Sequence, residues 1–291
     1  MNITRHICVN TEIREFDNGN VIFYDSLSRA YAEIIEEHYI KKYSNTAFMC
    51  TPCYPWFSFE DNMITKEMLE RYSQRIFCNF DQFTHEDYML RIFDWCRQVG
   101  ITNIWEWQIP ILGIYPDDLK GITTFMPVRY VTKYEHLAIQ PVENPEFLYV
   151  FAGNLMERRY DLMRDHMFDY LPFKIISGIR YADNINEFNN CACVLNIHSE
   201  DGACGALQEM LRLHELMCLN IPIVSEVSNI NYFGNLITEI NKDDIPNLYN
   251  LIVNDVITIN QNPASGYKAM TYTDEAFERH RINLLQFHKV I

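Results

Sequence analysis

The sequence predicts an α/β protein made of two domains, each built around a mostly parallel β-sheet. Short apolar runs alternate with helical stretches along most of the chain, which is typical of parallel sheets covered by helices on both faces. The length of 291 residues corresponds to one or two domains. With 48% hydrophobic and 14% aromatic residues, the chain can also build a large core.

The first half shows this alternation less regularly than the second half. Leu27, Ala30 and Ile34 recur at helical spacing after Ser26, a plausible N-cap, and predict a helix over 26–43. The predicted strands of this half are 6–10, 21–25, 47–51, 103–112 and 123–131. Two more helices are predicted over 65–78 and 85–99. We therefore predict an N-terminal Rossmann-like domain over 1–140, in which the polar, proline-containing segment 133–146 is the interdomain linker.

The second half predicts a Rossmann-like domain over 147–270. Its apolar strand candidates are followed by glycine or polar residues, and helical stretches separate them. The predicted strands are 147–151, 173–177, 191–197, 221–225 and 236–240, and the predicted helices are 156–170, 184–190, 206–219 and 245–253. A last helix over 273–289, within a C-terminal segment 271–291, is expected to pack back on the N-terminal domain.

The charge balance restricts the class of ligand. The formal net charge of −15 argues against sequence-independent binding of nucleic acid or of an anionic membrane, since both need a basic surface. No segment approaches the roughly 20 apolar residues of a membrane span, and the N-terminus does not resemble a signal peptide. We therefore expect a cytoplasmic protein, in which a small phosphate ligand can still be bound by a few local cations.

Nine cysteines, an odd number, predict reduced thiols rather than a disulfide framework. Cys50 and Cys53 form a Cys-x-x-Cys pair that fits a redox pair or half of a zinc site, but no second pair stands at a matching spacing. Cys191 and Cys193 share one face of a predicted strand. Buried free thiols are the simplest interpretation of both pairs, and no metal site is predicted.

The segment 196–226 has the features of an anion site. A loop with Gly202 and Gly205 leads from a predicted strand into a helix, and a helix N-terminus attracts anions through its free N–H groups and its dipole. Glu209, Arg212 and Glu215 follow at three-residue steps on one face of that helix. A solvated face with Glu–Arg pairs explains this spacing equally well.

Three motifs in this half resemble the donor half of GT-B glycosyltransferases. They are Val150-Phe-Ala-Gly-Asn-Leu-Met-Glu-Arg-Arg159, Val194-Leu-Asn-Ile-His198 with Glu209-x-x-Arg212-x-x-Glu215-Leu216, and Pro222-Ile-Val-Ser-Glu226. The resemblance is to a group from bacteria and large DNA viruses, and an exostosin-like branch is the other possible relation. It covers roughly residues 147–255, and the first half matches only through Asn10-Thr-Glu12.

The resemblance implies a role for each matching residue in holding a nucleotide sugar. Glu215 corresponds to the acidic residue that binds the ribose hydroxyls, and Glu209 stands near the place of a second acidic residue, where this chain has Leu207. The remaining donor-binding candidates implied by the resemblance are Gly153, Arg158, Arg159, Gly178, Arg180, Tyr181, His198, Ser199 and Arg212. Of these, Arg158 and Arg159 resemble the cations that neutralise the leaving diphosphate, a task that suits the bidentate guanidinium.

An inverting reaction also needs a general base from the first domain. Glu12, after the first predicted strand, and Asp25, after the second, are the catalytic candidates, although a helix cap or a surface carboxylate is the more frequent role of such residues. Trp105, Trp107 and Tyr115 add an aromatic character that favours packing or stacking on a sugar acceptor.

These features together predict a GT-B glycosyltransferase that moves a sugar from a UDP- or GDP-sugar to a glycan acceptor. The nucleotide sugar is a co-substrate, so no cofactor is expected, and the lack of an Asp-x-Asp motif favours a metal-independent reaction. A non-catalytic protein of the same fold that binds a nucleotide sugar or a glycan is the alternative. A dinucleotide-dependent oxidoreductase ranks lower, because no Gly-x-Gly-x-x-Gly motif follows a strand.

Overall fold

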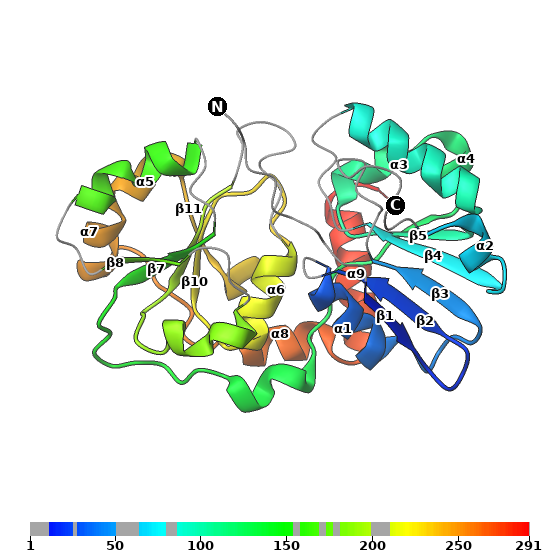
Figure 1. Ribbon diagram of the computed structural model, residues 1–291. Coiled ribbons are helices and arrows are strands. Elements are labelled where there is room, and N and C mark those ends of the chain that lie inside the picture. Colours follow the sequence, from blue (N-terminus) through cyan, green and yellow to red (C-terminus); the bar gives the residue numbers. More distant parts are fainter. Residues whose placement is uncertain are drawn as a thin grey trace, which may run out of the picture. The chain divides into compact units, whose positions relative to one another are not determined.

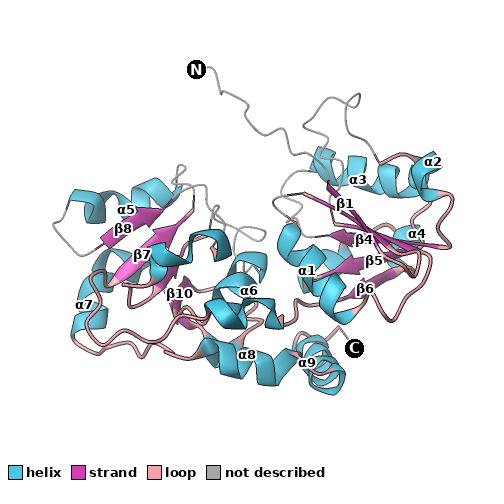
Figure 2. Ribbon diagram, turned by 60° about the horizontal axis from the view of Figure 1, so that its bottom comes forward, coloured by secondary structure: helices cyan, strands magenta, loops and turns pink. Residues whose placement is uncertain are grey.

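The computed structural model describes residues 12–25, 28–50, 64–79, 86–153, 158–168, 173–176, 181–198 and 210–290. The chain divides into two compact units, Met1–Pro127 and Val128–Ile291. Each unit contains one β-sheet with helices beside it, so the predicted α/β class and the two sheet-containing halves are confirmed (Figures 1 and 2).

The first unit is built on a six-stranded sheet in which the strands follow their order in the chain, β1-β2-β3-β4-β5-β6. All neighbours are parallel except the edge pair, where β1 runs antiparallel to β2 with Glu12 opposite Tyr24. The strands are β1 (Glu12–Glu15), β2 (Val21–Tyr24), β3 (Thr46–Met49), β4 (Gln74–Asn79), β5 (Asn103–Glu106) and β6 (Thr123–Phe125). Strands β2 and β3 are buried throughout, and β4 and β5 are buried from Ile76 and Ile104 onward, as apolar strands in the centre of a covered sheet must be.

Helices lie on both faces of this sheet (Figure 1). Tyr39, directly after α1, packs its ring 4.8 Å from that of Trp105, and Phe48 lies on the same face. Phe77 faces the other way, against Trp95 of α3, with ring centroids 5.7 Å apart. The helices of this unit are α1 (Arg29–His38), α2 (Lys66–Leu69), α3 (Glu86–Val99) and α4 (Asp117–Lys120), with a 3-10 turn η1 (Ile109–Gly113).

The second unit contains a five-stranded, entirely parallel sheet in the order β11-β10-β9-β7-β8. The strands are β7 (Tyr149–Ala152), β8 (Phe173–Ile176), β9 (Val194–Asn196), β10 (Ile223–Glu226) and β11 (Thr238–Ile240). Since the order places β9 in the centre, between β7 and β10, the carboxyl ends of these three strands lie side by side. Ligands of open α/β sheets bind at that edge.

The helices of the second unit also cover both faces. Met163 of α5 and Leu248 of α7 pack with Phe151 and Leu195 in one buried cluster, while α6 covers the other face through contacts with β10 (Figure 2). The elements are α5 (Arg158–Phe168), α6 (Met210–Cys218), α7 (Leu248–Val253), α8 (Pro263–Thr271), α9 (Asp274–Phe287) and the 3-10 turns η2 (Thr132–Leu137), η3 (Ala182–Phe188), η4 (Gly234–Leu236) and η5 (Lys242–Asn247).

Several sequence predictions about elements are wrong, and one of them is the strand expected over 123–131, which ends at Phe125. The helix expected over 65–78 is only the one-turn α2, and the second part of that range is strand β4. The strand expected over 103–112 ends at Glu106, because Pro110 stands in the 3-10 turn that follows. Helix α8 was not predicted at all, since its small and polar residues Pro263-Ala-Ser-Gly266 suggest a loop.

The segment 133–146 is not an open linker. Tyr134 and Ile139 are buried, Ile139 donates its backbone N–H to Leu219, and Asn220 donates its side-chain N–H to the carbonyl of Ile139. These contacts place the segment within the second unit, which begins at Val128 rather than after residue 140.

The C-terminal helix α9 is anchored inside the second unit by Arg129. The buried Arg129 guanidinium donates to the carbonyls of Thr271 and Tyr272 and to Asp274 at distances of 3.2, 2.6 and 2.9 Å. It also lies 4.5 Å from the centre of the Phe277 ring. The packing of this helix on the first unit remains a prediction.

The described cysteines are buried free thiols, as predicted: Cys50, Cys78, Cys96, Cys191, Cys193 and Cys218. Burial raises the pKa of Cys191 to about 12, so this thiol stays protonated and unreactive at neutral pH. Cys53 lies outside the described residues. None of the described helices is both long and apolar enough to cross a membrane.

Candidate functional site

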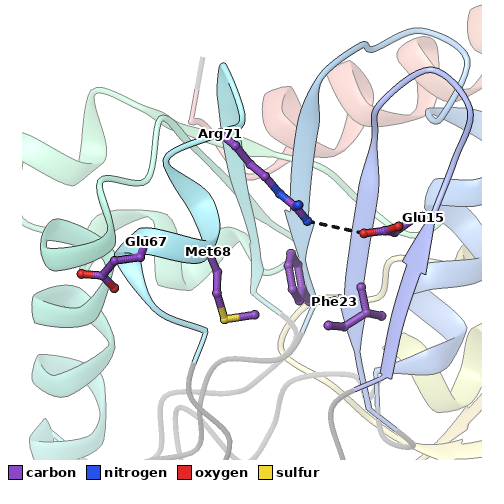
Figure 3. Close-up of a pocket in the computed structure, with 6 residues that line it drawn as sticks. Glu15, Phe23, Glu67, Met68 and Arg71 are labelled. Carbon is purple, nitrogen blue, oxygen red and sulfur yellow. Dashed lines mark hydrogen bonds and ion pairs between the residues drawn. The ribbon is translucent and has the colours of Figure 1, made fainter.

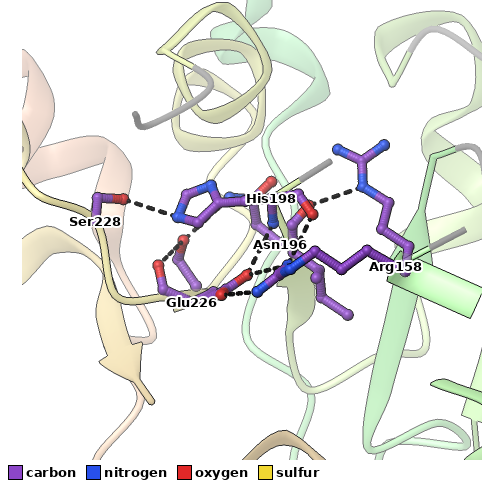
Figure 4. Close-up of polar contacts among 8 residues, drawn as sticks. Arg158, Asn196, His198, Glu226 and Ser228 are labelled. Atoms are coloured by element: carbon purple, nitrogen blue, oxygen red, sulfur yellow. Dashed lines mark hydrogen bonds and ion pairs between the residues drawn. The ribbon is translucent and has the colours of Figure 1, made fainter. Parts of the chain in front are cut away.

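An arginine–glutamate pair lies at the carboxyl edge of the second sheet. Arg158 opens α5, and Glu226 is the last residue of β10. The guanidinium donates to both carboxylate oxygens, with Nη1 2.9 Å from Oε2, and Nη1 also donates to the carbonyl of His198 at 3.0 Å (Figure 4). The two side chains are 14% and 8% exposed, so this bidentate pair is mostly shielded from water.

Two further arginines reach the same strand end from opposite faces of the sheet. Arg159 of α5 donates through Nε to the carbonyl of Ile197 at 2.9 Å and is itself buried. Arg212 of α6 donates to the side-chain oxygen of Asn196 at 3.2 Å. A Cβ atom added to Gly153 would lie 3.4 Å from Arg212 Nη2, so this guanidinium also approaches the end of β7. We call Arg158, Arg159 and Arg212 the arginine cluster.

His198 lies at the same edge of the sheet, two residues after the end of β9. Its backbone N–H donates to Glu226 at 3.1 Å, and its Nε2 lies 3.2 Å from the hydroxyl oxygen of Ser228 (Figure 4). The ring is 2% exposed, and its Nδ1 has no hydrogen-bond partner in the part of the chain that the structure describes. A buried imidazole nitrogen of this kind is available to a ligand.

The local sequence explains why these groups converge. Asn196 and Ser225 are neighbours in the β9–β10 register, and the Asn196 amide donates to the Ser225 hydroxyl at 3.0 Å. This contact fixes the Asn196 carbonyl oxygen toward Arg212 of α6. Three guanidinium groups, those of the arginine cluster, therefore gather at one strand end of a chain whose net charge is −15. Such an edge suits an anionic ligand.

Glu215 lies on α6, where it is 6% exposed and accepts a hydrogen bond from the backbone N–H of Ala182 at 3.0 Å. It therefore stands beside the start of η3, which follows β8. Tyr181, the residue before Ala182, is also buried and packs edge-on against Phe188. The structure thus brings together Glu215 and Tyr181, two of the predicted donor-binding residues, through the backbone of Ala182.

Several predicted donor-binding residues lie outside the described residues. They are Gly178, Arg180, Ser199 and Glu209, together with the loop glycines Gly202 and Gly205. Of the other predicted residues, Gly153, Arg158, Arg159, His198 and Arg212 meet around the end of β9, and Tyr181 and Glu215 meet beside η3.

The two predicted catalytic carboxylates lie at the corresponding edge of the first sheet. Glu12 is exposed at the start of β1 and accepts a hydrogen bond from the Tyr24 hydroxyl at 2.7 Å. Asp25 is fully buried, and its Oδ1 accepts from both the backbone N–H and the hydroxyl of Ser28, at 2.8 and 2.9 Å. Asp25 therefore stabilises the start of α1, and a catalytic role of either residue stays a prediction.

A third acidic residue at this edge was missed by the sequence analysis. Glu106, the last residue of β5, is fully buried and accepts hydrogen bonds from Asn79, Tyr115 and the backbone N–H of Gln108 at 2.6, 2.8 and 2.9 Å. Burial raises the pKa of this carboxyl to about 8, although the hydrogen bonds favour the ionised form. The available signal was an acidic residue at the end of an otherwise apolar strand, beside two tryptophans.

A separate cavity of about 210 Å³ lies between β1, β2 and α2 (Figure 3). Its lining combines apolar side chains with the exposed Arg71–Glu15 ion pair, whose N–O distance is 3.4 Å. The lining residues are Ile13, Glu15, Phe23, Glu67, Met68 and Arg71. None of the predicted site residues contributes to this cavity. The described residues also contain no group of three or more His, Cys, Asp or Glu side chains placed to hold a metal ion.

Comparison with known proteins gives distant structural likenesses, two of which are described below. No family model and no curated protein matches the chain by sequence. The chain is similar in structure to the apo form of the lipopolysaccharide outer core galactosyltransferase WaaB, with a TM-score of 0.43, 10% sequence identity, and coverage of 91% of this chain and 81% of the other. It is also similar to AviGT4, a glycosyltransferase involved in avilamycin A biosynthesis, with a TM-score of 0.41, 8% identity, and coverage of 89% and 79%.

Proposed function

We propose that this chain is a glycosyltransferase that moves a sugar from a UDP- or GDP-sugar to a glycan acceptor. The arginine cluster at the end of β9 is the observation that carries this proposal. Arg158, Arg159 and Arg212 are assembled there at the edge of the sheet where α/β domains bind ligands. Nucleoside diphosphates are anions of the size and charge that such a cluster suits.

The reaction needs positive charge at this place. Glycosyl transfer develops an oxocarbenium-like sugar while negative charge accumulates on the departing diphosphate. The guanidinium groups stabilise that charge, and the buried Nδ1 of His198 offers one more contact to a phosphate or sugar oxygen. With these cations in place the proposed reaction does not require a metal ion.

Glu215 is proposed to bind the ribose of the donor. One of its oxygens, Oε1, accepts the N–H of Ala182, which holds the carboxylate beside η3. A carboxylate can accept from two neighbouring hydroxyl groups, as a ribose diol presents them. Tyr181 lies next to Ala182 in the chain and is proposed to contribute to the base side of the same site.

Glu12 and Asp25 remain the proposed general bases for the acceptor hydroxyl. They flank the end of β2, where Glu12 is exposed and Asp25 is buried and bound to Ser28. A non-catalytic protein that binds a nucleotide sugar or a glycan is the alternative function, and it would retain the arginine cluster and Glu215 without using either base.

Hydrolysis of nucleotide sugars tests the proposal. The purified chain is incubated with a panel of UDP- and GDP-sugars, and release of the nucleoside diphosphate is measured with and without EDTA. We expect slow hydrolysis of at least one donor, unchanged by EDTA, because transfer to water is a common side reaction of a competent site. Glu215→Gln is expected to weaken donor binding about tenfold or more, since it removes the charge of a ribose ligand.

Arg164→Ala is the matched control, because Arg164 lies on the exposed side of α5. This variant should behave like the wild type in every assay. Binding of a nucleotide sugar without any hydrolysis or transfer would favour the non-catalytic alternative. Failure of all nucleoside diphosphates and nucleotide sugars to bind would contradict both functions.

A further inference from the structure

The carboxyl end of β5 holds buried polar atoms that have no hydrogen-bond partner among the described residues. Gln108 is fully buried, and neither Nε2 nor Oε1 of its side chain makes a hydrogen bond within the described residues. The neighbouring Trp107 is 3% exposed, and its indole Nε1 also has no acceptor there. Two donor groups and one acceptor, carried by consecutive residues, are therefore unsatisfied at one strand end.

Such groups are rare in native proteins unless something binds them. Most buried polar side-chain atoms are hydrogen-bonded, because an unpaired group loses its contacts with water without replacement. The location is also significant, since Gln108 and Trp107 follow the last residue of a parallel strand, at the edge where ligands of α/β sheets bind. An unsatisfied amide in this position indicates a ligand contact.

The backbone that carries these side chains is held firmly. Glu106 accepts the backbone N–H of Gln108 at 2.9 Å. Asn79 of β4 and Tyr115, two residues after η1, donate to the same carboxyl group. Tyr115 is fixed in turn against Phe93 of α3, with ring centroids 5.1 Å apart. The Gln108 amide is consequently presented on a rigid support, which lowers the entropy lost when a ligand binds.

The chemistry of these groups selects a neutral, hydroxyl-bearing ligand. An amide both donates and accepts hydrogen bonds, and an indole N–H donates. A sugar hydroxyl can form a hydrogen bond with either group, because it is both a donor and an acceptor. An anion would be repelled by the amide oxygen and by the oxygen atoms of the nearby Glu106 carboxyl group. The cations that an anion needs are instead in the arginine cluster of the second unit.

We propose that Gln108 and Trp107 form a binding site for the hydroxyl groups of a neutral sugar. The assignment of this sugar as the acceptor of the transfer reaction rests on the proposed function, but the binding site itself does not. The site is formed entirely by the first unit and by residues that the resemblance did not include.

Gln108→Leu tests the site because it should affect the melting temperature and sugar binding differently. If the amide is unsatisfied in the free protein, an apolar side chain of similar size should leave the melting temperature unchanged or raise it, because no hydrogen bond is lost. The same substitution should abolish sugar binding. Gln98→Leu, on the exposed face of α3, is the matched control, and Trp107→Phe removes the indole N–H while keeping an aromatic ring.

Binding is measured on the full chain by ligand-observed NMR with the methyl glycosides of glucose, galactose, mannose and N-acetylglucosamine. We expect at least one glycoside to bind the wild type and Gln98→Leu equally, and to bind Gln108→Leu at least tenfold more weakly. Trp107→Phe should weaken the same glycoside severalfold. UDP and GDP binding, measured on the same samples, should not change in any of these variants.

Two results would overturn the proposal: binding of no glycoside to the wild type, or undiminished binding to both Gln108→Leu and Trp107→Phe. A clear fall in the melting temperature of Gln108→Leu without glycoside binding would show that the amide has an internal structural role. If glycosides bind through Gln108 but no nucleoside diphosphate binds, the sugar site stands and the proposed function fails.

Discussion

The two sheets end in buried carboxyl groups that are stabilised in opposite ways. Glu106 ends β5 in the first unit and is surrounded by neutral donors, namely the Asn79 amide, the Tyr115 hydroxyl and the Gln108 backbone. Glu226 ends β10 in the second unit and is bound by the Arg158 guanidinium through both oxygens. Over the whole residue, Glu106 and Glu226 are 0% and 6% exposed, so burial alone does not distinguish them.

This difference indicates what each edge is built to bind. Burial raises the pKa of Glu106 to about 8, and its hydrogen-bond donors in the described part of the chain are neutral, so its surroundings suit neutral hydroxyl groups. Glu226 instead binds Arg158, one of the three guanidinium groups of the arginine cluster, which suit an anion. The same position in two similar sheets therefore serves a neutral ligand in one unit and a charged ligand in the other.

Removal of Arg158 should give the largest effect, because it leaves the Glu226 carboxylate buried and unpaired. We expect Arg158→Ala to lower the free energy of unfolding by about 3–5 kcal/mol, measured by urea denaturation. The double variant Arg158→Ala/Glu226→Gln should recover part of this loss, since it removes the unpaired charge. A loss below about 0.5 kcal/mol in Arg158→Ala, the range of ordinary surface changes, would show that the pair does not organise this edge.

The pH dependence of stability should separate Glu106 from other carboxylates. Its folded-state pKa of about 8 lies above the ordinary value of 4.5, so the folded state holds the proton more tightly than the unfolded state. The resulting stabilisation is complete below about pH 4.5 and is lost as the pH rises toward 8. Relative to Glu106→Gln, the wild type should lose about 1.4 kcal/mol per pH unit between pH 5 and pH 8.

The measurement compares urea denaturation of the wild type and Glu106→Gln at pH 5, 6, 7 and 8. The slope of the difference with pH carries the test, because the amide variant can have a constant offset from altered hydrogen bonds. A difference that does not change with pH would mean that Glu106 titrates normally and that the two strand ends do not differ as described.

The smallest effect on the free energy of unfolding is expected at Asp25, where a role in stability can be separated from a role in catalysis. Asp25→Asn keeps an oxygen that accepts from Ser28, so its free energy of unfolding should change by less than about 0.5 kcal/mol. Asp25→Ala removes the acceptor and should lose about 1 kcal/mol. If Asp25 is the general base, the transfer rate of Asp25→Asn falls by about 10²–10⁴; an unchanged rate leaves Asp25 as a structural residue and favours Glu12.

The alternation of apolar runs and helices was sufficient to predict the second sheet. Its five strands all lie within or beside the predicted ranges, because these ranges are short runs rich in apolar residues and are separated by helical stretches. The same reasoning failed at β4, where Arg75-Ile-Phe-Cys78 follows a genuine helical turn without a break that a pattern could detect. Short apolar runs do not distinguish a strand from a buried helix by periodicity alone.

The candidate site was only partly accessible to sequence reasoning. Arg158, Arg159, His198 and Arg212 were selected through a resemblance, and the structure places them around one strand end. Glu226 was part of a quoted motif but received no role, since its importance depends on a contact with Arg158 that is 68 residues away in the chain. Glu106 and Gln108 were missed because burial, rather than residue type, makes them unusual.

Calorimetric titration with UDP and GDP tests the central claim most directly, since it asks whether the arginine cluster binds a nucleoside diphosphate. We predict that one of them binds the wild type and Arg164→Ala with equal affinity. Arg212→Ala should bind it about tenfold or more weakly, because a hydrogen bond from a charged group contributes about 1.5–3 kcal/mol. Equal affinity in Arg212→Ala and the wild type, or no binding of either nucleotide, would contradict the account.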